Sequence, residues 1–214
     1  MSYLNLLDEG QSYTFRSYFE MPYETDEVLS EFGVSLVSKK LSLPRMQVDV
    51  AEVDKLSTDL EAALEVVELA SETARREVLV APVLIKVVRL SSSRLRIEYP
   101  LIVSDQLKGK LDYLVEGRQR LLVIEAKNDD LSRGFTQLAV ELIALASREA
   151  RREATPKILY GAVTIGNVWL FGWFDTAEQK MYRDTSLYPV PDDLQDVMET
   201  LMGILASEPQ LAVA

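Results

Sequence analysis

The chain has 214 residues, of which 48% are hydrophobic, and it carries a formal net charge of −11 at pH 7. This length suffices for one substantial hydrophobic core, and the acidic balance argues against a surface that binds nucleic-acid phosphates indiscriminately. The absence of cysteine and histidine excludes disulfides, thiolate nucleophiles, a Ser-His-Asp triad and the usual zinc sites. Any metal ion is therefore expected to be a hard cation held by oxygen atoms.

The sequence contains no apolar run long enough to cross a bilayer, and its first residues, MSYLNLLDEGQSYTF, lack the pattern of a signal peptide. We therefore expect a cytoplasmic protein with no membrane segment. Residues 1–50 are interpreted as an N-terminal extension that packs on one main domain, residues 51–214. Within the extension, residues 34–43 predict a strand pair that ends at Pro44.

The main domain begins with a helical pattern. Residues 54–76 carry apolar side chains at intervals of three and four, which predicts one long amphipathic helix. Pro82 fits the first turn of a following helix, or a kink in a helix that continues.

The next segments predict a sheet covered by helices. Three stretches, 94–103, 109–117 and 120–127, read as successive antiparallel strands. A helix is expected over 133–154. After it come two strands, 157–165 and 168–175, joined by a Gly-Asn turn, and a final helix over 192–206.

Charged side chains interrupt two of these strands. Glu125 and Lys127 are two residues apart, so they point to one face, and Asp112 on the preceding strand can lie beside them. Two carboxylates and the Ala126 carbonyl form an oxygen cage suited to magnesium, and Lys127 could orient or deprotonate an attacking water. A cross-strand salt bridge on a solvated sheet face is the structural alternative.

The same formula occurs a second time in the chain. Asp175, Glu178 and Lys180 repeat the pattern of an acid followed by Glu-x-Lys. This second match lies in a segment that is predicted to be an exposed turn, without flanking apolar runs. The apolar context therefore favours the first match as the site.

The chain resembles the PD-(D/E)xK nuclease superfamily. More narrowly, SETARREVLVAPVL, LLVIEAKN, FTQLAVELIAL and YGAVTIGNVWLFGWF are similar to the N-terminal nuclease region of type I restriction enzyme motor subunits and their stand-alone relatives. The similarity covers about residues 68–175. It implies an α/β, restriction-endonuclease-like fold with a mixed central sheet flanked by helices. No GxxxxGK phosphate loop occurs, so no motor domain is expected in these residues.

The resemblance also implies roles for individual residues. Asp112 and Glu125 would bind the metal with the Ala126 carbonyl, Lys127 would assist the attacking water, and Gln137 would support the site. Leu111 stands where the name of the superfamily has proline.

An additional carboxylate is implied on the early helix. Glu72 is our choice for it, and Glu68, one helical turn earlier, is a credible substitute. For either residue, a solvated helix carboxylate is the alternative.

The expected activity is magnesium-dependent hydrolysis of phosphodiester bonds in DNA, with manganese as a possible substitute. We expect a homodimer, because two-strand cleavage by one site per chain needs two chains. A non-catalytic interaction or regulatory protein that retains the fold is the rival interpretation, and an RNA-directed or partner-delivered nuclease is a third. A local phosphate-binding surface could be formed by Lys108, Lys110, Arg148, Arg151, Arg152 and Lys157, although solvated helix ends and loops account for them equally well.

Overall fold

The computed structural model describes residues 6–8, 10–117, 121–127, 130–152 and 156–206. Its helices are α1 (Phe15–Glu20), α2 (Thr25–Ser30), α3 (Val50–Val66), α4 (Glu72–Arg75), the π-helical segment η1 (Arg76–Val80), α5 (Ala81–Ser91), α6 (Leu131–Ala150) and α7 (Leu194–Ala206). Its strands are β1 (Ser35–Lys39), β2 (Arg94–Ile102), β3 (Lys108–Glu116), β4 (Leu121–Ala126), β5 (Ile158–Thr164), β6 (Val168–Asp175), β7 (Lys180–Asp184) and β8 (Tyr188–Pro189).

All eight strands belong to one mixed sheet. Its order is β1-β7-β6-β5-β4-β3-β2, and β8 pairs with β6 off this path. The β1–β7 and β4–β5 pairs are parallel, and the others are antiparallel. A parallel pair needs a crossover connection, and between β4 and β5 that connection contains α6.

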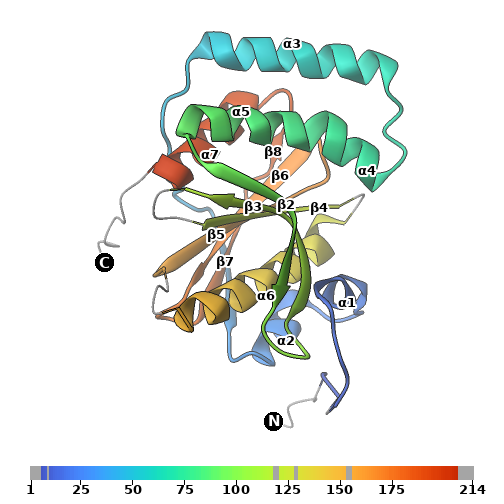
Figure 1. Cartoon of the computed structure of the whole chain (residues 1–214), viewed down its shortest axis with the longest axis vertical. Coiled ribbons are helices and arrows are strands. Elements are labelled where there is room, and N and C mark those ends of the chain that lie inside the picture. Colours follow the sequence, from blue (N-terminus) through green and yellow to red (C-terminus); the bar gives the residue numbers. More distant parts are fainter. Residues whose placement is uncertain (1–5, 9, 118–120, 128–129, 153–155, 207–214) are drawn as a thin grey trace.

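Helices cover both faces of the sheet (Figure 1). One core lies between the sheet and α1, α2 and α6, and it contains Phe135 and Leu138. The other lies between the sheet and α5 and α7 and contains Val83 and Leu201, and it extends to α3, which packs outside these helices against α7 and η1 (Figure 1). The chain is therefore a mixed α/β protein whose central sheet is flanked by helices, as the sequence predicts.

The central part of the sequence folds as its pattern predicts. The expected meander is β2, β3 and β4, the expected helix is α6, and β5 and β6 form the expected hairpin. Gly166 in the turn has φ +94°, a conformation that glycine adopts without strain. No helix in the described ranges is long and apolar enough to span a bilayer.

The prediction of a single long helix over 54–76 is wrong. Helix α3 ends at Val66, and Val67 is extended with φ −115° and ψ 127°. A new helical segment then begins at α4, where the Ser71 hydroxyl accepts a hydrogen bond from the Ala74 N–H at 3.1 Å. Serine followed by an acidic first turn is a helix start signal, so the sequence carried the break. Segments α4, η1 and α5 follow one another directly, with Pro82 in the first turn of α5.

The edge of the sheet also differs from the expectation. The range 34–43 contains one strand, β1, rather than the expected strand pair, and β1 pairs with β7. The sequence reading placed no strand at β7. The N-terminal part of the chain therefore supplies an edge strand of the sheet, and α1 and α2 pack on α6.

Candidate active site

The Asp112 side chain lies where β3 separates from β4. Ladder pairing between β3 and β4 ends at Tyr113 opposite Ile124, and the Ala126 N–H donates to Asp112 Oδ2 at 3.0 Å. On β2, Glu98 has φ +50°, the left-handed region that non-glycine residues seldom adopt. The Asp112 carboxylate thus takes a backbone N–H at the point where β3 separates from β4.

Glu125 and Lys127 project from the end of β4 toward α6. Their side chains are in contact, with Lys127 Nζ 2.6 Å from Glu125 Oε1. Only 1% of Glu125 and 8% of Lys127 is exposed. Gly134 of α6 permits this packing, because a Cβ there would lie 3.0 Å from Lys127 Cγ and 2.6 Å from Val163 Cγ2.

Helix α6 contributes an amide and a further carboxylate. Gln137 Nε2 donates to Glu125 Oε1 at 2.7 Å and to Glu141 Oε1 at 2.8 Å. Glu141 is fully buried. Three buried oxygens of this cluster, Glu125 Oε2, Gln137 Oε1 and Glu141 Oε2, meet no N–H or hydroxyl donor, but the Glu125 and Glu141 carboxyls are close enough to share a hydrogen bond when one of them is protonated. Such atoms are costly unless a proton or a cation satisfies them.

Burial and crowding shift the ionisation of the acids. Burial, together with the charge of Asp112, raises the pKa of Glu125 to about 8, despite the attraction of Lys127. Burial and the charge of Glu125 raise the pKa of Glu141 well above its ordinary value. The pKa of Asp112 is also raised by burial, although Arg76 opposes this. Burial lowers the pKa of Lys127, but the charge and hydrogen bond of Glu125 outweigh it, so that pKa is raised.

Arg76, the first residue of η1, pairs with the remaining Asp112 oxygen. Its Nη1 lies 3.2 Å from Asp112 Oδ1 and 3.9 Å from Glu98 Oε1. The guanidinium lies over the Tyr113 ring, 5.2 Å from the centroid. Asp112 is near enough for its charge to act on Glu125, but its described contacts are with Arg76 and Ala126.

The two carboxylates considered for the early helix have different positions. Glu72 is the first residue of α4, and its charge contributes to raising the pKa of Lys127. Glu68 is exposed in the segment between α3 and α4. The premise that Glu68 lies one helical turn before Glu72 is therefore wrong, because no helix joins them.

The oxygen atoms of the site are suitable ligands for a divalent cation, but they are not arranged around a single position. Within the described ranges, no group of three or more acidic side chains is arranged to hold a metal ion. Asp112 is bound to Arg76, whereas the buried Glu125 Oε2 meets no N–H or hydroxyl donor. Carboxylate and carbonyl oxygens are the ligands that magnesium prefers, so a cation would require Asp112 to exchange Arg76 for the metal.

The second match to the motif has its Glu-x-Lys at the surface. Glu178 lies in the turn before β7, and its Oε2 is 3.1 Å from Lys180 Nζ. The Asp175 carboxylate accepts hydrogen bonds from the N–H groups of Ala177 and Glu178. The Asp175 carboxylate is buried and closes this turn, whereas Glu178 and Lys180 form an ion pair at the surface.

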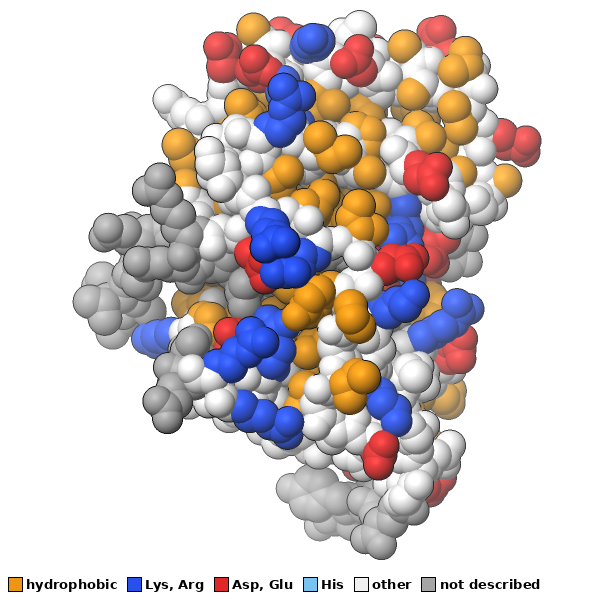
Figure 2. Space-filling view, viewed as in Figure 1, with side chains coloured by type: hydrophobic (Ala, Val, Ile, Leu, Met, Phe, Trp, Pro, Cys, Tyr) orange, Lys and Arg blue, Asp and Glu red, His pale blue; other side chains and the backbone are white. Residues whose placement is uncertain are grey.

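The basic residues singled out in the sequence are mostly paired with acids. Figure 2 shows Lys and Arg side chains spread over the middle and lower parts of one face. Lys108 pairs with Asp105 at 3.0 Å, and Lys110 pairs with Glu98 at 3.2 Å. On α6, Arg148 and Arg152 both approach Glu149, at 2.7 Å and 3.8 Å.

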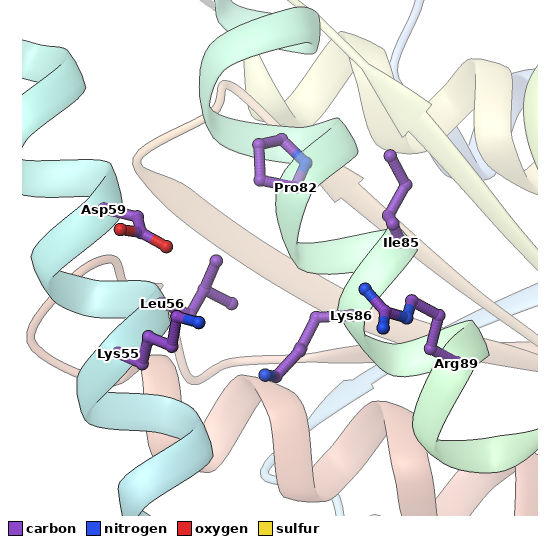
Figure 3. Close-up of a pocket in the computed structure, with 7 residues that line it drawn as sticks. All are labelled: Lys55, Leu56, Asp59, Pro82, Ile85, Lys86 and Arg89. Atoms are coloured by element: carbon purple, nitrogen blue, oxygen red, sulfur yellow. The ribbon is translucent and has the colours of Figure 1, made fainter.

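A groove between α3 and α5 lies apart from this site. It has a volume of about 260 Å³, and none of the site residues lines it. Figure 3 shows its side chains, which come from both helices: Lys55, Leu56, Asp59, Pro82, Ile85, Lys86 and Arg89.

The sequence reading missed Arg76, Glu141 and Phe19. Glu141 was detectable, because it follows Gln137 by four residues and such residues share a helix face. Arg76 and Phe19 gave no local signal, since they reach the site from segments distant in the sequence. Phe19 of α1 lies under the Lys127 ammonium, with Nζ 4.9 Å from the ring centroid.

No protein-family model matches this sequence, and no curated protein is significantly similar to it.

Proposed function

We propose that the chain is a divalent-cation-dependent phosphodiesterase of the PD-(D/E)xK kind, acting as an endonuclease on DNA. One observation carries this proposal. The buried Glu125 carboxylate has one oxygen held by Lys127 and Gln137, and it lies within the electrostatic reach of two further carboxyl groups, Asp112 and Glu141. A carboxylate held in this way is poorly suited to a purely structural role, because its charged form is penalised by burial.

The residues have distinct tasks in this proposal. Asp112, Glu125 and the Ala126 carbonyl would hold magnesium or manganese, with Glu72 as the additional carboxylate. When bound, the cation would supply charge neutralisation at the phosphate and lower the pKa of the attacking water. Gln137 fixes the orientation of Glu125 through its 2.7 Å hydrogen bond.

Lys127 would orient the attacking water and stabilise the developing negative charge at the phosphate, because its raised pKa keeps it as a charged ammonium. Its ammonium is held against Glu125, which defines its position. Removal of one preorganised donor that acts on the transition state costs about a hundredfold to a thousandfold in rate.

The experiment is a cleavage time course on supercoiled plasmid, single-stranded DNA and RNA, with magnesium, manganese or chelator. Lys127→Ala should lose about a hundredfold or more of the rate. Lys180→Ala is the matched control, because it removes the lysine of the exposed Glu-x-Lys and should cut normally. Equal cleavage by wild type and Lys127→Ala would refute the assignment, and the RNA arm separates the two nucleic acids.

A homodimer is part of this proposal. One site per chain cuts one strand, so cleavage of both strands requires two sites, most simply related by a two-fold axis. A dimer would also present the basic side chains of both chains to one DNA molecule, although each chain has a net negative charge.

The rival function is a non-catalytic interaction protein. The net charge of −11 and the Arg76–Asp112 ion pair favour it, because the first opposes binding to phosphates and the second occupies a proposed ligand. If no nucleic acid is cut under any of these conditions, the non-catalytic interaction protein becomes better supported than the nuclease.

A further inference from the structure

We propose that helix α1 forms a wall of this active site and that Phe19 is a positioning residue for the Lys127 ammonium, an inference that rests on the proposed nuclease function. Helix α1 lies in the N-terminal part of the chain, outside the residues that resemble a nuclease. In Figure 1 it lies near the beginning of α6, at the same side of the sheet.

Helix α1 is anchored firmly enough to serve as a wall. Phe15 and Tyr18 are each only 1% exposed, and the Tyr18 hydroxyl donates to the Gln106 carbonyl at 2.7 Å. Gly109 of β3 allows the close approach, since a Cβ there would lie 2.6 Å from Phe15 Cδ2. Phe19 belongs to the same short helix, so its ring position is set by these buried neighbours.

Phe19 and Glu125 hold the Lys127 ammonium from two directions. The ring centroid is 4.9 Å from Nζ, within the range of a cation–π contact, and Glu125 Oε1 is 2.6 Å from the same atom. Phe19 is half-buried, while Lys127 is 8% exposed. A lysine side chain has four flexible bonds, so a single ion pair leaves it freedom that a ring packed against it removes.

A charge interaction also connects α1 with the site. The pKa of Arg16 is raised mainly by its hydrogen bond to Glu20, and Glu72 adds a smaller contribution. Glu72 acts on Lys127 as well. The charge of Glu72 on α4 therefore acts both on α1 and on the lysine of the site.

Loss of the ring should act on the chemical step. Without Phe19 the ammonium gains access to water and additional rotamers, so a smaller fraction of molecules has Nζ in place. Misplacing a catalytic group lowers kcat and leaves substrate affinity nearly unchanged, and we expect a loss of about tenfold in kcat.

The first test measures accessibility and needs no activity. The full chain is acetylated briefly with a lysine-reactive reagent, and mass spectrometry follows Lys127, with Lys180 as an internal reference. We expect severalfold faster labelling of Lys127 in Phe19→Ala. Phe19→Tyr keeps the ring, and Tyr23→Ala removes an aromatic side chain that is 39% exposed, so both should label as wild type does.

The second test measures kcat and KM on the plasmid substrate. Phe19→Leu keeps an apolar side chain without a ring and should lose kcat, whereas Phe19→Tyr should restore it with unchanged KM. Unchanged labelling in both Phe19→Ala and Phe19→Leu would overturn the covering role, and faster labelling with unchanged kcat would overturn the positioning role. If the wild type cuts no substrate, both the proposed function and the catalytic role of Phe19 are wrong. The labelling result alone then decides whether α1 covers Lys127.

Discussion

The buried carboxylate of Glu141 provides a quantitative test of the site's electrostatics. Burial and the charge of Glu125 raise its pKa well above the ordinary 4.5, so Glu141 keeps its proton to a higher pH in the folded protein than in the unfolded chain. Glutamine has nearly the same shape as the protonated acid. Glu141→Gln should therefore preserve the fold, and the Gln137 Nε2 hydrogen bond, now 2.8 Å, still has an acceptor.

The effect on stability depends on pH, with a definite sign. Above about pH 4.5 the unfolded wild type loses this proton while the folded state keeps it, so the stability that protonated Glu141 contributes falls as the pH rises toward the folded pKa. The slope is about 1.4 kcal/mol per pH unit. Glu141→Gln lacks this loss, so its stability relative to wild type should rise as the pH rises from about 5 toward the folded pKa of Glu141.

The assay is urea unfolding of both proteins at about pH 5 and about pH 7, with Glu141→Ala as a comparison. The alanine variant leaves a cavity and removes the acceptor of Gln137, which should cost about 2–5 kcal/mol at either pH. If the difference between wild type and Glu141→Gln is the same at both pH values, Glu141 is ionised in the folded protein and this reasoning is wrong.

Three further predictions concern the cation and the assembly. Magnesium or manganese at about 100 times its Kd should stabilise the wild type by about 2.7 kcal/mol in thermal melts; an equal shift in Asp112→Asn would contradict the assignment of that ligand. Arg76→Gln removes a charge that competes for Asp112 and should tighten cation binding by roughly tenfold in calorimetry; weaker binding would show that Arg76 supports the site instead. Light scattering should give twice the 24.1 kDa mass of one chain, and a mass of one chain would count against the dimer.

The sequence by itself determined the local parts of the fold and site. Alternation over β2, β3 and β4 and the helical period of α6 were sufficient to predict those elements, because both patterns arise from backbone geometry over a few residues. The same geometry put Glu125 and Lys127 on one face. The break before α4 was also encoded locally, in Ser71, although the continuous apolar spacing obscured it.

Only the tertiary structure decided which distant segments meet. The parallel pairing of β1 with β7, the approach of Arg76 to Asp112 and the placement of Phe19 against Lys127 join residues far apart in the chain. Local propensities do not specify such contacts, because these contacts form when separate apolar faces pack into shared cores. The ionisation of the site was likewise beyond sequence reasoning, since the pKa of Glu125 depends on burial under α6 and on Asp112 from another strand.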